Sequence, residues 1–140
     1  GHPDVRAVIS VNKGLVTQAS AAIPVVPLYF AILYKVMKRA GNHENCIQQI
    51  ARLFTQKLYT PEGFRTDENG FIRMDDYELL PEIQEEVKKC WKAVTTDTVN
   101  QYCDIDGYWE DFYHMFGFHY SDIDYTQDVD ANVEINGIVM

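Results

Sequence analysis

The sequence has little of what a self-contained nucleotide-binding domain needs. It has eight glycines in 140 residues, and none of them forms a G-x-G-x-x-G pattern. In a dinucleotide-binding domain that pattern makes the turn from strand to helix where backbone N–H groups hold the pyrophosphate. We therefore expect no phosphate-binding loop in this chain.

Cysteine and histidine are also scarce. The three cysteines, Cys46, Cys90 and Cys103, form no C-x-x-C pair, and their odd number is typical of reduced thiols in an intracellular protein. The four histidines do not fall at paired ligand spacing on one helix. We expect neither a metal site nor a catalytic cysteine.

The chain contains no long uninterrupted apolar run. The longest, from Ala21 to Tyr34, has fourteen residues and includes Pro24 and Pro27. A membrane-spanning helix needs about 20 apolar residues. We expect no membrane insertion, and a cytoplasmic protein or, in a eukaryote, a mitochondrial one.

Acidic residues outnumber basic ones, but unevenly. Residues 1–60 hold seven Lys or Arg against two Asp or Glu, a net charge of +5, and residues 61–140 hold five against nineteen, a net charge of −14. The total of −9 argues against nucleic acid as a partner. The basic part could attract an anionic ligand, such as a nucleotide diphosphate or a CoA phosphate, or could simply form a solvated surface.

Residues Val5–Val11 are apolar at nearly every position and rich in β-branched side chains, which predicts a strand covered on both faces. A polar junction, Asn12–Thr17, follows this strand. In open parallel sheets, ligands bind beyond the carboxyl ends of the strands, so the junction is the first candidate site. One strand cannot form a sheet, and we expect an amino-terminal body outside this sequence to supply its partner strands.

Hydrophobic spacing and capping residues predict helices over Leu15–Ala22, Leu28–Ala40, His43–Leu58, Pro81–Ala93, Asp97–Tyr102 and Tyr108–Phe116. Gly41 and Asn42 would end one helix and cap the next, which predicts a helical hairpin. The second helix of that hairpin carries one apolar stripe, Cys46, Ile47, Ile50, Leu53, Phe54 and Leu58.

Glu68–Gly70 predicts the turn of a small β-hairpin between Gly63–Thr66 and Phe71–Met74. Carboxylates follow it: Asp75, Asp76 and the nearby Glu78 could act as general acid or base, but more often cap the next helix. The acidic tail from His119 onward is expected to pack loosely.

Five sequence blocks occur in order along nearly the whole chain: KGLVTQASAAIPVVPLY (Lys13–Tyr29), YKVMKRAGNHENCIQQI (Tyr34–Ile50), MDDYELL (Met74–Leu80), VTTDT (Val94–Thr98) and DGYWEDFYHMFGF (Asp106–Phe118). With these blocks the chain resembles the carboxyl-terminal third of the single-chain trans-2-enoyl-CoA and enoyl-ACP reductases of the FabV type. The resemblance implies an α/β fold, the carboxyl-terminal part of a Rossmann-like, short-chain-dehydrogenase-like reductase. This part would be mostly helical, with one parallel-sheet strand and a small β-hairpin.

The resemblance also implies a division of labour. Residues 1–60 would form the last sheet strand, the cofactor-side loop and a substrate-binding helical hairpin, and residues 61–140 a β-hairpin and a helical cap with an acidic tail. The whole enzyme would transfer a hydride from NADH to C3 of an enoyl-CoA or enoyl-ACP thioester in fatty acid synthesis. The family's catalytic Tyr, followed nine positions later by Lys, would lie upstream of residue 1. Tyr29 and Lys38 share that spacing but fall inside an apolar helix, so the isolated chain is expected to be inactive.

The resemblance assigns candidate binding residues. Positions matching Leu15, Val16 and Thr17 contact NAD in the family, and Lys13 could meet the phosphate next to the nicotinamide. From the residues alone, Thr17 could instead cap the following helix and Lys13 could be an ordinary exposed lysine.

The resemblance also places two aromatic residues, Tyr34 and Tyr108, in the wall of an acyl-chain pocket. Aromatic residues at helical spacing are otherwise usually core residues. Gly14 stands where the family more often has Ala or Ser.

The carboxyl-terminal region of this family is sometimes described as an FAD-binding domain. No residue pattern specific to a flavin accompanies that label here, so NADH is the cofactor we expect. Two other functions stay open from the sequence: a non-catalytic helical module that binds another protein, and a degenerate reductase fragment without a ligand.

Overall fold

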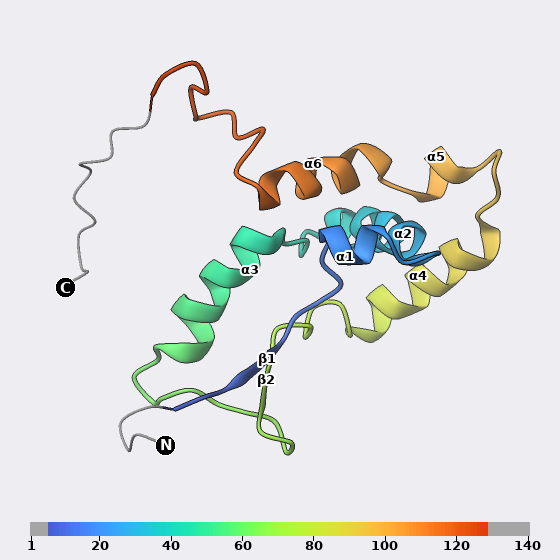
Figure 1. Ribbon diagram of the computed structural model, residues 1–140. Helices are drawn as coiled ribbons and strands as arrows, with labels where there is room; N and C mark the ends of the chain where they lie inside the picture. Colours follow the sequence, from blue (N-terminus) through green and yellow to red (C-terminus); the bar gives the residue numbers. More distant parts are fainter. Residues whose placement is uncertain (1–5, 129–140) are drawn as a thin grey trace.

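The computed structural model describes residues 6–128 (Figure 1). Its elements, in chain order, are β1 (Ile9–Val11), α1 (Gln18–Ala21), α2 (Val26–Ala40), α3 (Cys46–Arg52), the π-helix η1 (Leu53–Leu58), β2 (Phe71–Arg73), α4 (Pro81–Ala93), α5 (Val99–Tyr102) and α6 (Ile105–Met115). No helix within residues 6–128 is long and apolar enough to cross a membrane.

Helix α2 forms the centre of the core. It begins after Val25, whose φ of 74° lies in the left-handed region, with Pro27 in its first turn, and it ends at Gly41, which adopts φ 76°. Ile32 and Leu33 are completely buried on it. Helices α4 and α6, which follow residue 60, pack against α2, which precedes it. One core therefore contains residues from both sides of the expected division at residue 60.

The two strands form one parallel pair, with Ile9 opposite Phe71 and Val11 opposite Arg73. The chain therefore contains a partner strand for β1, and the expectation that it has none was wrong. The expected β-hairpin was also wrong. The turn before β2 exists, with Gly70 N–H donating to Asp67 C=O at 3.0 Å, but residues 63–66 form no strand and β2 pairs with β1 instead.

Helix α3 departs most from expectation. Asn45, not Asn42, is its N-cap and accepts a hydrogen bond from Gln48 N–H, and after Arg52 the chain continues as a π-helix. Helix α3 turns away from α2 and contacts α6, so the predicted helical hairpin is absent from the described residues (Figure 1). The apolar stripe is present but lies outward: Ile47 and Ile50 are each 48% exposed.

The later helices follow the sequence more closely. Helix α4 has the predicted bounds, and α5 lies inside its predicted range. Helix α6 begins three residues early, because Asp104 caps it by accepting from Gly107 N–H at 3.0 Å. Beyond α6, residues 121–128 are exposed, as expected of a loosely packed tail, and residues 129–140 lie outside the described residues.

Candidate functional site

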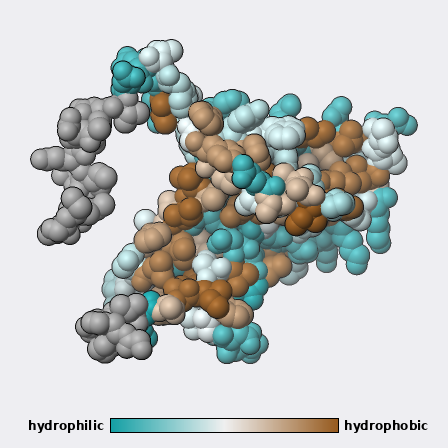
Figure 2. Space-filling view, viewed as in Figure 1, coloured by the Kyte–Doolittle hydropathy of each residue, from teal (hydrophilic) through white to brown (hydrophobic). Residues whose placement is uncertain are grey.

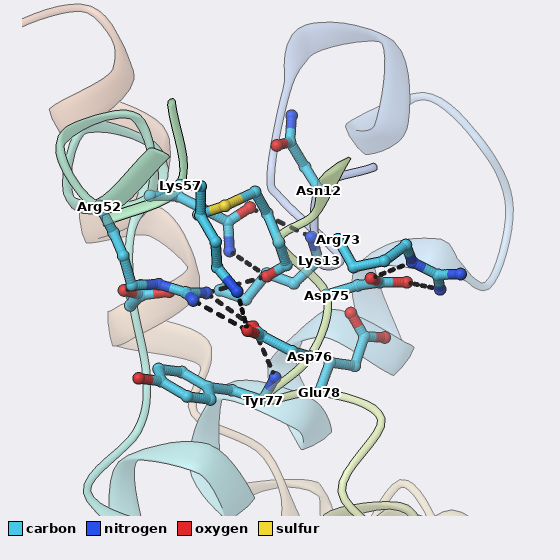
Figure 3. Close-up of polar contacts among 12 residues, drawn as sticks. Asn12, Lys13, Arg52, Lys57, Arg73, Asp75, Asp76, Tyr77 and Glu78 are labelled. Atoms are coloured by element: carbon cyan, nitrogen blue, oxygen red, sulfur yellow. Dashed lines mark hydrogen bonds and ion pairs between the residues drawn. The ribbon is translucent and has the colours of Figure 1, made fainter. Parts of the chain in front are cut away.

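The carboxyl ends of the two parallel strands bring two polar segments together (Figure 3). Asn12–Thr17 follows β1, and Met74–Glu78 follows β2. Because ligands of open parallel sheets sit at this edge, the two segments form the candidate site. We call Asn12–Thr17 the junction loop.

Lys13 is buried in the junction loop, with 3% of its surface exposed. The ammonium donates to Gly14 C=O at 3.2 Å and lies 4.6 Å from the centre of the Tyr34 ring. Burial lowers the pKa of Lys13 to about 8, against the opposing effect of Asp111 and Glu78. The hypothesis of an ordinary exposed lysine was wrong, and contact with a phosphate stays a prediction.

Two polar side chains of α3 hold the segments at the strand ends, Gln49 both of them and Arg52 the one after β2. Gln49 accepts from Lys13 N–H at 3.1 Å and donates to Met74 C=O at 3.2 Å, so one amide joins the ends of both strands. Arg52 donates to the same carbonyl at 3.0 Å and to both carboxylate oxygens of Asp76, and also pairs with Glu44 (Figure 3).

Gln49 and Arg52 were not predicted from the sequence, because the apolar stripe was the most evident pattern in this helix. Gln49 and Arg52 lie three positions apart on one face of α3, which is the signal that could have identified them.

Thr17 is the N-cap of α1. Its Oγ1 accepts from Ser20 N–H at 3.0 Å, and Ser20 Oγ accepts from Thr17 N–H at 2.8 Å, which completes a capping box. The capping role weighed from the sequence is thus confirmed, and the contact with a cofactor stays a prediction. Next to Thr17, Leu15 N–H and Val16 C=O make no hydrogen bond to any residue in 6–128.

Tyr34 is completely buried beneath the junction loop. Its hydroxyl oxygen accepts from Val16 N–H at 2.9 Å, and its ring lies 4.5 Å from that of His43, whose Nε2 is 3.0 Å from Asp111 Oδ2. Burial raises the pKa of Tyr34, so the hydroxyl stays protonated. The structure therefore gives Tyr34 a contact with the junction loop that the sequence did not indicate.

Tyr108 lies on α6 and belongs to the same buried cluster as Tyr34. It helps to line an apolar cavity of about 220 Å³ between α2, α5 and α6, together with Leu28, Ala31, Cys103 and Trp109. Its buried hydroxyl has no hydrogen-bond partner among the described residues, and burial raises its pKa. A role of either tyrosine in an acyl-chain pocket stays a prediction.

Gly14 is in close contact with α2. A Cβ atom on this residue would lie 2.6 Å from Cε1 of Phe30, which is closer than van der Waals contact allows. The side chain of Phe30 thus occupies the space that an alanine at position 14 would need. This contact gives a steric reason for glycine here.

The comparisons with known proteins agree with one another. A family model described as the trans-2-enoyl-CoA reductase catalytic region matches residues 2–59, and the enoyl reductase FAD binding domain matches residues 66–129. The enoyl-[acyl-carrier-protein] reductase [NADH] of Cytophaga hutchinsonii is 51% identical over 134 residues, 96% of this chain and 34% of that protein. The Coxiella burnetii protein of the same name is 50% identical over 96% of this chain and 33% of its own length.

Solved structures match equally well. The trans-2-enoyl-CoA reductase of Clostridium acetobutylicum in complex with NAD has a TM-score of 0.77 at 48% identity, covering 89% of this chain and 32% of that one. The Treponema denticola enzyme in complex with NAD has a TM-score of 0.78 at 47% identity, covering 91% of this chain and 32% of that one. In sequence and in fold, the chain is thus similar to about a third of the length of the trans-2-enoyl-CoA and enoyl-ACP reductases.

The chain spans about a third of the length of the curated relatives it matches. The Rossmann-like fold class expected from the resemblance is confirmed by the solved structures, although the small β-hairpin is not part of it. The name of the second family model calls for a test of FAD. In residues 66–128, Gly70 precedes β2, Gly107 lies inside α6 and Gly117 follows α6, so no glycine there stands between a strand and a helix. Residues 66–128 therefore do not offer the strand–glycine–helix turn that holds the pyrophosphate of a dinucleotide.

Proposed function

We propose that this chain is the carboxyl-terminal part of an NADH-dependent reductase that reduces the C2–C3 double bond of trans-2-enoyl-CoA or enoyl-ACP in fatty acid synthesis. The observation that carries the proposal is the match, at 48% identity over 89% of the chain, to a trans-2-enoyl-CoA reductase in complex with NAD. The chain would contribute the loop facing the cofactor and the helices facing the acyl chain. An amino-terminal body would contribute the phosphate-binding loop and the catalytic Tyr and Lys.

The junction loop offers a fitting contact for the nicotinamide. Leu15 N–H can donate and Val16 C=O can accept, and a carboxamide has the complementary acceptor and donor. The hydroxyl oxygen of Tyr34 accepts a hydrogen bond from Val16 N–H. This bond fixes the backbone that carries Leu15 N–H and Val16 C=O. The residues proposed for the cofactor remain Lys13, Leu15, Val16 and Thr17, and those for the acyl chain Tyr34 and Tyr108.

An apolar surface that no other part of residues 6–128 covers supports the proposal of an amino-terminal body. Ile47, Ile50 and Phe54 lie on one side of α3 and η1, each about half exposed at 47% to 48%, and Ile9 on β1 is 60% exposed. Figure 2 shows this hydrophobic surface along α3 and η1. Covering it would remove apolar area from water, which is the main favourable term in association. The division at residue 60 and the cytoplasmic or mitochondrial location remain part of the proposal.

Crotonyl-CoA-dependent oxidation of NADH tests the proposal. The purified 140-residue chain is expected to show none, and the same chain joined to its amino-terminal body is expected to be active. Activity of the chain alone would contradict the division of labour. Inactivity of the joined protein, with the chain folded, would favour a protein-binding module or a degenerate fragment.

Two threonines allow a sharper test in the joined protein. Thr17→Val should lower the affinity for NADH, because losing a hydrogen bond to a bound polar group costs on the order of 1 kcal/mol. Thr98 also precedes a short helix, but away from the junction loop, so Thr98→Val is the matched control. Normal NADH affinity together with an early melt of Thr17→Val would leave Thr17 as a helix cap only.

A further inference from the structure

Glu78 lies five residues beyond β2, in the turn before α4, and is 9% exposed. Its backbone is anchored, because Gln84 Nε2 donates to Glu78 C=O at 2.8 Å. Glu78 does not cap α4, since the N-cap position is Leu80 and no side chain caps that helix. The position of this carboxylate therefore needs another explanation.

The two carboxylate oxygens of Glu78 reach two different segments. Oε2 accepts from Gly14 N–H at 2.5 Å, and Oε1 accepts from Tyr29 O–H at 2.7 Å. Hydrogen bonds to an ionised carboxylate are shorter and stronger than neutral ones. One side chain thus ties the end of β2 both to the junction loop and to the first turn of α2.

Glu78 affects the protonation of two neighbouring groups. The ammonium of Lys13, in the same loop, is stabilised by the negative charge of Glu78. The hydrogen bond to Glu78 adds to burial in raising the pKa of Tyr29 to about 12, so Tyr29 stays a donor. With both oxygens accepting hydrogen bonds from this chain, the carboxylate is held in place.

We propose that Glu78 is a positioning residue for NADH binding: it fixes Gly14 N–H and thereby holds the backbone of Leu15 and Val16 in the orientation that the nicotinamide needs. This rests on the proposed function. Glu78 would act on the cofactor through the junction loop, since both of its oxygens already accept hydrogen bonds from this chain. Substitution of Glu78 changes no residue of the junction loop, but it removes the hydrogen bond that fixes the loop backbone. The loop should then be more mobile where it faces the cofactor.

The test uses the chain joined to its amino-terminal body and the variants Glu78→Ala, Glu78→Gln and Tyr29→Phe. Glu68→Gln is the matched control, because Glu68 is exposed on the turn before β2. Glu78→Ala should raise KM for NADH by about tenfold with KM for crotonyl-CoA nearly unchanged, since a lost hydrogen bond to a charged group is worth that factor or more. Glu78→Gln keeps one acceptor and should give about a threefold rise.

Tyr29→Phe separates the two contacts. It removes only the bond to α2, so KM for NADH should stay within about twofold of the wild type. A rise as large as that of Glu78→Ala would mean that Glu78 acts through α2, and would overturn the proposal. An unchanged KM for NADH in Glu78→Ala, with a lower Tm, would reduce Glu78 to a structural residue.

Hydrogen exchange gives a readout that does not depend on activity. The amides of residues 14–17 should exchange faster in Glu78→Ala and as in the wild type in Tyr29→Phe. If the wild type does not oxidise NADH with crotonyl-CoA, the proposed function fails, and unchanged exchange in Glu78→Ala would separately overturn the positioning role. If Glu78→Ala does not fold, Glu78→Gln carries both measurements.

Discussion

Helices α2 and α3 both carry apolar residues at helical spacing, but α2 buries its apolar side and α3 buries its polar side. On α2 the apolar side is inside, with Ile32 and Leu33 completely buried. On α3 the apolar side is outside, with Ile50 48% exposed, and the buried residues are Gln49 and Arg52, at 1% and 6% exposure. The same periodicity thus gives two different arrangements.

The neighbours of each helix explain the difference. Helix α2 packs against α4 and α6, whose backbone groups are satisfied within the helices, so apolar side chains fit there. Helix α3 lies under the ends of two strands, where Lys13 N–H and Met74 C=O need hydrogen-bond partners. A buried backbone group without a partner is costly, and Gln49 and Arg52 meet that need.

Arg52→Met should have the largest effect on this comparison. It leaves the carboxylate of Glu44 without its partner and that of Asp76 with Lys57 alone, and breaking one side of a buried ion pair costs about 4 kcal/mol. Denaturant unfolding of the chain measures the loss in free energy. Arg65→Met is the control, because the pair of Arg65 with Glu62 is exposed and should contribute little. Equal effects of the two substitutions would show that the polar side of α3 is not what stabilises it.

Two isoleucines sharpen the comparison next. Ile32→Ala should lower the free energy of unfolding by about 3 kcal/mol, because it empties a fully buried site on α2. Ile50→Ala should cost less than about 1 kcal/mol, since that side chain is half exposed. In the chain joined to its amino-terminal body, the cost of Ile50→Ala should rise. An unchanged cost there would mean that the apolar side of α3 and η1 stays open.

Lys13, which lies between the two helices, predicts a pH dependence. Burial lowers its pKa in the folded chain to about 8 from 10.5, so between these values the unfolded chain binds more protons and stability rises with pH. The free energy of unfolding should gain about 2 kcal/mol from Lys13 between pH 8 and pH 9.5. Lys13→Met should remove this gain when its unfolding is compared with that of the wild type at each pH. Parallel curves for the two proteins would contradict a buried, easily deprotonated ammonium.

The contact between Gly14 and α2 predicts a smaller effect than the changes at Arg52, Ile32 and Lys13. Gly14→Ala should cost about 1.5 kcal/mol, because the new methyl group meets Phe30 at 2.6 Å. In Phe30→Leu the same change should cost much less, so the double-mutant cycle should show coupling. Additive losses would mean that Phe30 moves aside freely.

The sequence predicted well wherever one local signal decided the structure. Pro81 in the first turn gave the bounds of α4, and Gly41 gave the end of α2. It failed where distant groups decided. The pairing of β2 with β1 depends on residues about 60 positions apart, and a local turn signal at Gly70 suggested a hairpin instead.

The candidate site was predicted in location but not in detail. The junction loop lies at the edge of the parallel pair, as the rule for strand ends predicts. The burial of Lys13 and the contacts of Gln49 and Glu78 could not be predicted, because these two residues reach the loop from 36 and 64 positions away, and Arg52 reaches Met74 across 22 positions. Side chains of these types are exposed in most proteins, so their burial here follows from tertiary contacts alone.

The parallel pair also sets an order of events during folding. Ile9 and Phe71 are opposite one another, so within this chain the pair cannot form until about 60 further residues have been made. At the usual rate of synthesis, roughly 5 to 20 residues per second, β2 is made roughly 3 to 12 s after β1. Closing so long a loop is slow compared with forming a helix, so α2 is complete before the strands meet. The junction loop, which depends on both strand ends, is therefore among the last parts of this chain to reach its final shape.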